Sequence, residues 1–152
     1  MTDSSYLIFI LAGLVLAGLI GVLAFLRRMR VPKSLPVDEM EGHDFEYYCA
    51  DLLRKCGYQD VEVTKGSGDF GVDILARKEG ITYAVQCKCY DSLIGVFAVQ
   101  QVYAGRDYYG CMVGAVMTNQ YFTDPARKLA AELGILLWDR DHLEYLEGIA
   151  DG

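Results

Sequence analysis

The sequence predicts a mixed α/β domain with one central sheet flanked by helices, in the element order α-β-β-β-α-β-α-β. Three observations support this. Apolar residues recur at spacings of three and four over residues 38–57, which is typical of an amphipathic helix. Three short strand-like segments separated by glycine-containing turns follow. A continuous apolar run over 111–117, bounded by turn residues, is typical of a buried central strand.

The first half of the domain holds the first helix and three strands. The helix over 38–57 has a predicted buried face formed by Phe45, Tyr48, Cys49, Leu52, Leu53 and Cys56, and Gly57 ends it. Strands are expected over 61–64, 72–77 and 81–90, and the turn at 78–80 joins the last two into a hairpin.

The second half alternates helices with strands. A helix over 95–109 has Val99, Val102 and Tyr103 as expected inner positions, and the strand over 111–117 follows it. A helix over 124–133 is predicted with Asp124 as its N-cap and Pro125 in its first turn. A strand over 135–138 and a short helix over 141–147 complete the domain. Alternation of this kind is characteristic of one sheet covered by helices.

An uncharged apolar stretch over residues 6–26 precedes this domain. A helix of this length reaches roughly 30 Å, the thickness of a hydrocarbon core, so a transmembrane helix is predicted. A cleaved signal peptide is disfavoured, because the stretch lacks a basic leader and runs directly into basic residues. A buried core helix is disfavoured by the length of the uncharged run.

The basic residues after this stretch predict its orientation. Arg27, Arg28, Arg30 and Lys33 belong on the cytoplasmic side by the positive-inside rule. We therefore expect an inner-membrane, single-pass protein with its N-terminus outside. The expected parts are a short extracytoplasmic segment (1–5), the transmembrane helix (6–26), a basic juxtamembrane linker (27–37) and a cytoplasmic domain (38–152).

Composition constrains the domain further. Its five cysteines are an odd number without C-x-x-C spacing, which agrees with a reducing compartment. Of the chain's 14 basic and 21 acidic residues, four basic residues and one acidic residue precede residue 38, so the domain carries a formal charge of about −10. This acidity argues against tight, non-specific binding of DNA through its phosphates.

A glycine-rich loop over 66–71 matches the pattern G-x-G-x-x-G. A dinucleotide site would need a helix after this loop, but a strand is expected there. Asp69 and Asp73 would also repel phosphate unless a cation lay between them. A cofactor site is therefore disfavoured.

Polar residues interrupt the apolar hairpin that follows the loop. Asp73 is expected opposite Gln86, and Lys88 shares a strand face with Gln86. One interpretation is a structural ion pair between Asp73 and Lys88. The other is a metal site, in which Asp73, Gln86 and the backbone carbonyl of Cys87 offer oxygens to Mg²⁺ while Lys88 polarises water or stabilises charge on phosphorus.

Glu46 lies at the edge of the predicted buried face of the first helix. It could add a metal or water contact to this site. From spacing alone, a boundary glutamate paired with a lysine is an equally good interpretation.

These motifs resemble the Mrr-like restriction endonucleases of the PD-(D/E)xK nuclease superfamily. The resemblance rests on Phe45-Glu46, on Gly68-Asp69-Phe70-Gly71-Val72-Asp73 and on Gln86-Cys87-Lys88. It continues through residues 101–105 and 118–122 and covers about residues 40–143. It implies a restriction-endonuclease-like core, and the membrane helix predicted from the apolar stretch precedes that core.

The resemblance also implies roles. Asp73 would be the metal-binding acid, Gln86 would stand in place of the second acid, Lys88 would be the catalytic lysine, and Glu46 would be a helix carboxylate near the metal. Asp69 and Gln101 are peripheral candidates. The implied reaction is hydrolysis of phosphodiester bonds in double-stranded or modified DNA, with Mg²⁺, or Mn²⁺ as its substitute.

We therefore expect a membrane-anchored, Mg²⁺-dependent DNA endonuclease, with restriction of foreign or modified DNA as its role. Two alternatives stay open: an inactive nuclease-fold module for binding or regulation at the membrane, and a repair or junction-cleaving nuclease. A homodimer is expected on chemical grounds, since cutting two strands often takes two sites.

Overall fold

The computed structural model describes residues 36–65, 68 and 70–152. Residues 36–152 form one compact unit. Its elements, in chain order, are η1 (Pro36–Glu39), α2 (Gly42–Lys55), β1 (Gln59–Val63), β2 (Ile74–Lys78), β3 (Ile81–Lys88), α3 (Val96–Tyr108), β4 (Val113–Thr118), α4 (Asp124–Leu133), β5 (Ile135–Trp138) and α5 (Arg140–Ala150).

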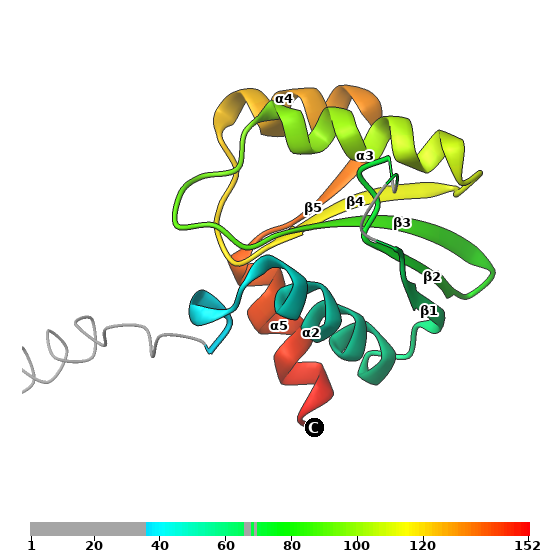
Figure 1. Ribbon diagram of the computed structural model, residues 1–152, viewed down its shortest axis with the longest axis vertical. Helices are drawn as coiled ribbons and strands as arrows, with labels where there is room; N and C mark the ends of the chain where they lie inside the picture. Colours follow the sequence, from blue (N-terminus) through cyan, green and yellow to red (C-terminus); the bar gives the residue numbers. More distant parts are fainter. Residues whose placement is uncertain (1–35, 66–67, 69) are drawn as a thin grey trace, which may run out of the picture. The chain divides into compact units, whose positions relative to one another are not determined.

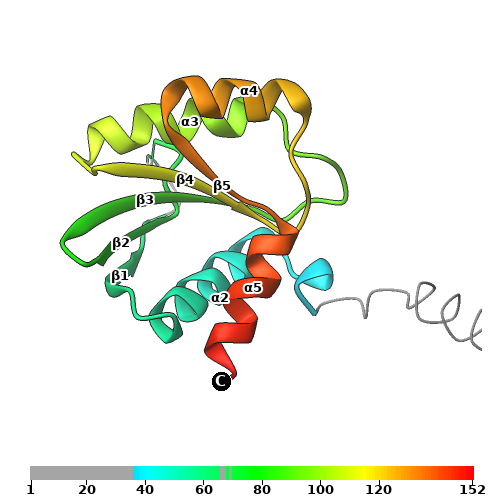
Figure 2. The same ribbon diagram turned by 180° about the vertical axis from the view of Figure 1, so that it is seen from behind.

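The unit has three layers, with the sheet between two pairs of helices. Helices α3 and α4 cover one face, and α2 and α5 cover the other (Figures 1 and 2). The predicted mixed α/β class and its flanking helices are therefore confirmed, and the elements follow one another in the predicted order. The structure adds η1 before the first helix and extends the last helix to Ala150.

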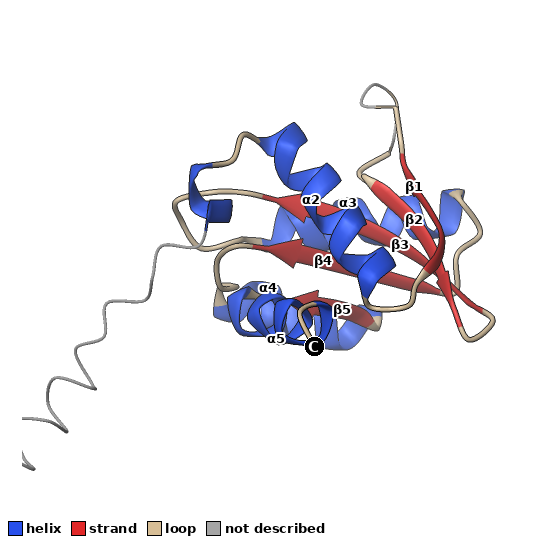
Figure 3. Cartoon of the chain, turned by 90° about the horizontal axis from the view of Figure 1, so that it is seen from below, coloured by secondary structure: helices blue, strands red, loops and turns tan. Residues whose placement is uncertain are grey.

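The five strands lie in the order β1-β2-β3-β4-β5, which Figure 3 shows from below. β1, β2 and β3 pair antiparallel, whereas β3, β4 and β5 pair parallel. Parallel neighbours need a crossover, and α3 and α4 supply the two crossovers on the same face. β3 is thus the strand at which an antiparallel meander meets a parallel sheet.

A two-residue turn fixes the register of the β2–β3 hairpin. Lys78 pairs with Ile81, and the residues between them, Glu79 and Gly80, have φ values of 52° and 82°. Positive φ at both central positions defines a type I′ turn, whose twist matches that of the strands it joins. This register pairs Ile74 with Val85, which places Asp73 beside Gln86 as predicted.

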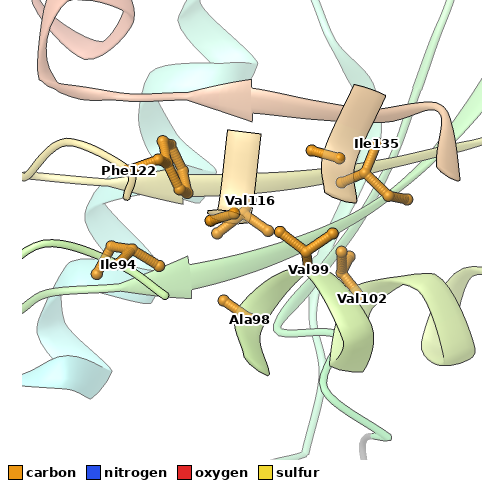
Figure 4. Close-up of a cluster of buried hydrophobic side chains, with 9 residues drawn as sticks. Ile94, Ala98, Val99, Val102, Val116, Phe122 and Ile135 are labelled. Atoms are coloured by element: carbon orange, nitrogen blue, oxygen red, sulfur yellow. The ribbon is translucent and has the colours of Figure 1, made fainter. Parts of the chain in front are cut away.

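An apolar cluster holds α3 and α4 on the sheet. Val99 and Val102 of α3 converge with Val116 of β4 and Ile135 of β5 (Figure 4), and all four side chains are at most 5% exposed. On the opposite face, Phe45 and Leu53 of α2 and Leu143 of α5 are fully buried. The predicted inner positions Val99 and Val102 are therefore correct.

Two predicted helix starts are wrong in detail. The first helix was expected from Asp38, but residues 36–39 form a 3₁₀ turn and α2 begins at Gly42. The N-cap of α4 is Thr123, whose hydroxyl accepts a hydrogen bond from the Ala126 amide (3.3 Å), whereas Asp124 is the first helical residue. Both Thr and Asp are good N-caps, so adjacent candidates cannot be ranked by residue type alone.

The structure does not support a membrane anchor. The predicted transmembrane helix, residues 6–26, lies outside the described residues. Within the described part, none of the helices combines the length and apolar character needed to cross a bilayer. The 13-residue α3, for example, reaches only about 20 Å and includes Arg106 and Asp107. The predictions of a membrane anchor and of an inner-membrane location are therefore wrong within the part of the chain that the structure describes.

Candidate active site

Buried polar side chains gather at the carboxyl ends of β3 and β4. Gln86, Thr118 and Asn119 are at most 2% exposed, and they are the buried polar or charged residues among those that the structure describes. Burial of such groups is costly unless each is hydrogen-bonded, so their clustering marks this end of the sheet as special. Of the residues predicted to carry chemistry, Gln86, Cys87 and Lys88 lie at this end of β3.

Asp73 is fixed at the start of β2 by its backbone and its side chain. Its amide donates to the carbonyl of Val85 (2.8 Å), and its own carbonyl accepts from the amide of Thr64 (2.9 Å). Its carboxylate oxygen Oδ2 accepts from the backbone amide of Cys87 (2.6 Å). The carboxylate therefore accepts a hydrogen bond from the backbone of β3, and this bond holds it beside the Gln86-Cys87-Lys88 segment.

Gln86 connects this segment to α3. It pairs with Val116, whose side chain packs under α3, so the Gln86 side chain faces the same helix. In one orientation of the Gln86 amide, both of its polar atoms have hydrogen-bond partners: the nitrogen donates to the carbonyl of Ala98 (2.8 Å), and the oxygen accepts from Lys88 Nζ (3.2 Å). The opposite orientation would instead donate to Gln101 Oε1 (2.9 Å) but would face the Ala98 carbonyl with an acceptor.

The preferred orientation joins three of the predicted residues. Lys88 donates to the Gln86 oxygen, and the terminal amide of Gln101, 2.9 Å away, donates to the same atom when its nitrogen is turned toward it. Gln101, predicted as peripheral, thus contacts the site directly. The buried amide holds the Lys88 ammonium at the carboxyl end of β3, where the Lys88 side chain is half-buried.

Glu46 approaches from α2, on the other face of the sheet. Its carboxylate pairs with His43, Nδ1 to Oε2 2.9 Å, rather than with a lysine. The pKa of the Cys87 thiol is raised well above its ordinary value, first by a hydrogen bond with Cys49, then by burial, and further by the charges of Asp73 and Glu46. Both carboxylates are therefore close enough to Cys87 to act on one buried group.

The loop before Asp73 is packed against α3. Gly71 has a φ of 77°, and a Cβ there would lie 2.7 Å from Cβ of Gln101. A Cβ on Gly105, one turn further along α3, would lie 2.6 Å from the carbonyl oxygen of Phe70. Two glycines thus permit the close approach that positions Asp73. Asp69, the other peripheral candidate, lies outside the described residues.

Asn119 holds the chain just after Lys88. Its side chain accepts from the Tyr90 amide (3.0 Å) and donates to the Tyr90 carbonyl (3.1 Å), so it pairs both backbone groups of one residue. Its Nδ2 also donates to Asp38 (3.0 Å), which in turn pairs with Arg140. Sequence reasoning gave Asn119 no role, because its partners are 29 and 81 residues away.

Asp38 makes this network sensitive to pH. Burial raises the pKa of Asp38, but hydrogen bonds from Arg140 and Asn119 and the charge of Arg140 outweigh it and lower the pKa below its ordinary value of 3.8. A depressed pKa means that the stabilisation is present above the unfolded-state pKa and is lost as pH falls through the folded-state value.

We expect Asp38→Asn to lower the free energy of unfolding at pH 7 and to lower it progressively less as the pH falls below the ordinary carboxyl pKa of 3.8 and through the lowered folded-state pKa of Asp38, where the wild-type carboxylate also becomes protonated. Urea unfolding at pH 7 and across this acidic range measures the difference. Glu132→Gln, at an exposed carboxylate of α4, is the control and should change little at any of these pH values. An equal loss for Asp38→Asn at all of them would contradict an electrostatic role.

A pocket of about 330 Å³ adjoins these residues, and sequence reasoning missed it. Lys88, Tyr90, Leu93, Phe97 and Gln101 contribute to its lining, and we call it the Lys88 pocket. Phe97 is 77% exposed. The exposure of this aromatic side chain cannot be predicted from the sequence, because it depends on which face of the helix packs on the sheet.

Similar solved structures agree with this architecture. The crystal structure of a protein of unknown function, AF1548, superposes with a TM-score of 0.60 at 21% sequence identity, covering 70% of this chain and 65% of that one. The DNA modification-dependent restriction endonuclease AspBHI superposes with a TM-score of 0.54 at 17% identity, covering 71% of this chain and 35% of that one. This chain therefore spans less than two thirds of either structure. No curated protein sequence matched the chain.

The fold and the placement of these residues define a domain of the restriction-endonuclease-like class. The family model Mrr_cat, described as restriction endonuclease, matches residues 37–146. The chain belongs to this family, which confirms the predicted family resemblance. The individual roles of Asp73, Gln86, Lys88, Glu46 and the Cys87 carbonyl stay predictions.

Proposed function

We propose that this chain is a Mg²⁺-dependent DNA endonuclease that acts through Asp73, Gln86 and Lys88, with Glu46 as a further carboxylate. The observation that carries the proposal is the Gln86 amide. It is 2% exposed, lies beside Asp73 in the hairpin, and accepts from Lys88 Nζ. An acid just before β2 thus lies beside an amide near the carboxyl end of β3, and this amide accepts from an ammonium on the same strand, in a domain whose family implies DNA as substrate.

The donor set suits Mg²⁺. This ion prefers hard oxygen ligands, keeps several waters and is usually bound through only one or two carboxylates. Within the described part of the chain, no three His, Cys, Asp or Glu side chains form a metal-holding cluster. Asp73, with Glu46, the Gln86 amide oxygen or the Cys87 carbonyl, would instead provide a small, all-oxygen set. When bound there, the ion polarises a phosphoryl oxygen and offsets developing negative charge.

The other tasks belong to the side chains. Lys88 would donate hydrogen bonds to a nonbridging phosphate oxygen or to the attacking water, where its charge stabilises the transition state. Gln86 positions the ammonium through its oxygen and is itself held by the Ala98 carbonyl. The Asp73 carboxylate accepts from the Cys87 amide. This bond fixes the distance between Asp73 and the strand segment that carries Gln86 and Lys88.

Removal of the ammonium tests the proposal. We expect Lys88→Ala to lower the rate of DNA cleavage in Mg²⁺ by about 10²- to 10³-fold, the usual loss when one preorganised donor is removed. The measurement is a time course with the full-length chain on plasmid, linear and methylated DNA, with EDTA added to parallel reactions. Lys128→Ala, at an exposed lysine of α4, should cleave at the wild-type rate. A folded wild-type chain that cleaves none of these substrates would favour the inactive binding module instead.

A further inference from the structure

We propose that the Lys88 pocket binds an unpaired nucleobase of the DNA substrate next to the cleaved phosphate, so that the preferred substrate is single-stranded or strand-separated at the cut. This inference rests on the proposed function, since it assigns the substrate of the same site. Three observations support it: the pocket is continuous with the candidate active site, aromatic rings are exposed along the pocket, and the arginines are paired with carboxylates.

The pocket is continuous with the candidate active site. Lys88 and Gln101 belong to both, because each contacts the Gln86 amide and each lines the pocket. A phosphate held by Lys88 would therefore have its neighbouring nucleoside at the mouth of the pocket. A volume of about 330 Å³ lies at the small end of ligand sites, which span roughly 300–1,000 Å³. This size suits a base with its sugar.

The walls suit a flat aromatic ligand. Phe97, Leu93 and Tyr90 are 77%, 56% and 52% exposed, so three large apolar side chains meet solvent at one place. Every nucleobase has a π-face that can stack on such rings irrespective of its sequence. A base that remains paired and stacked in a duplex cannot present that face to the pocket.

The charges argue against binding mainly through phosphates. All five arginines within residues 36–152 pair with carboxylates: Arg54 with Asp51, Arg77 with Asp60, Arg106 with Asp107, Arg127 with Asp139 and Arg140 with Asp38. Of the residues lining the pocket, Lys88 alone is a lysine or arginine. With the arginines paired and a single lysine at the pocket, few charged groups there can neutralise phosphates, so stacking is expected to supply much of the affinity.

Continuity also separates a nucleobase from a protein occupant. A second copy of the chain seated in the pocket would cover Lys88 and block the phosphate that the proposed function places there. A base in the pocket, by contrast, is attached to that phosphate. The nucleobase is thus the occupant that leaves the site able to act.

Fluorescence anisotropy with labelled oligonucleotides tests this proposal. The full-length chain is titrated with one sequence as a single strand, a duplex and a duplex with a central unpaired bubble, in Ca²⁺ to hold DNA without cleavage. We expect the single strand and the bubble to bind more tightly than the duplex. We expect the single-strand affinity to fall less than about tenfold between roughly 50 and 200 mM salt, because few counterions are released.

The decisive variant is Phe97→Ala, which should weaken binding of the single strand and the bubble about tenfold or more, whereas Phe97→Trp should retain it. Tyr145→Ala, at an exposed aromatic residue of α5, is the matched control and should bind as the wild type does. Both wild-type aromatic side chains are more than 60% exposed, so neither variant should unfold the chain.

The outcomes separate this proposal from the proposed function. Unchanged binding by Phe97→Ala, or wild-type preference for the intact duplex, overturns the nucleobase site even if Lys88-dependent cleavage is found. A wild-type dimer that Phe97→Ala converts to a monomer, without loss of single-strand binding, also overturns it in favour of a subunit interface. Phe97-dependent binding without any cleavage supports the nucleobase site and counts against the endonuclease.

Discussion

Asp73→Asn is expected to lower Mg²⁺-dependent DNA cleavage about 10³-fold while leaving the fold intact. Asparagine keeps the size of the side chain and an oxygen that can accept from the Cys87 amide, so the link between β2 and β3 is retained. It removes the negative charge, which is the property that a bound Mg²⁺ requires. Loss of several kcal/mol of metal-dependent stabilisation corresponds to this fold-change, at about 1.4 kcal/mol for each factor of ten.

The measurement is the initial rate of plasmid cleavage, with circular dichroism and thermal unfolding as controls for the fold. Asp60→Asn is the matched variant, because Asp60 is an exposed aspartate that pairs with Arg77 on the β1–β2 hairpin. It should cleave at nearly the wild-type rate. Wild-type cleavage by Asp73→Asn would show that Asp73 has a structural role, as in the alternative of an ion pair with Lys88.

Gly105→Ala is expected to destabilise the domain by about 1–3 kcal/mol and to slow cleavage at least tenfold. An added Cβ would lie 2.4 Å from Cγ2 of Val72 and 2.6 Å from the carbonyl oxygen of Phe70. The second contact is to backbone, so the loop itself must move, and such overpacking outweighs the higher helix propensity of alanine. The displaced loop leads directly into Asp73, and small misplacements of a reacting group have large effects on rate.

A second glycine provides the comparison. Gly148 lies exposed in α5, and nothing lies within 4 Å of a Cβ added there. Gly148→Ala should therefore stabilise the domain by roughly 0.5–1 kcal/mol through helix propensity alone. Chemical denaturation of both variants measures the pair of effects. A gain in stability for both would mean that the Gly105 contact with the loop is not tight in solution.

Local pattern predicts most of the fold. The hairpin can be placed from the sequence because its turn is short and its strands alternate, and this placement is enough to set Asp73 beside Gln86. The helix over 124–133 and the strand over 135–138 end where they are expected to end. These features depend on residues close together in the sequence.

The features that could not be predicted depend on packing between distant segments. Asn119 is a residue type common in loops. It becomes buried and hydrogen-bonded to Tyr90 and Asp38 only because the ends of β3 and β4 pack next to η1. The exposure of Phe97 follows from the rotation of α3 on the sheet. The preference of Glu46 for His43 over a lysine is an exception, since their spacing of three within one helix is visible in the sequence.

The change from antiparallel to parallel pairing at β3 has a consequence for how the site assembles during folding. Asp73 and Cys87 lie on the two strands of one hairpin, 14 residues apart in the chain. Bringing them together therefore closes only a short loop and loses little conformational entropy. The Gln86 contact with Ala98 and the walls of the Lys88 pocket require α3 to dock as a crossover between β3 and β4. The acidic half of the site thus depends on local contacts, whereas the half proposed to bind the substrate depends on contacts that form only with the whole sheet.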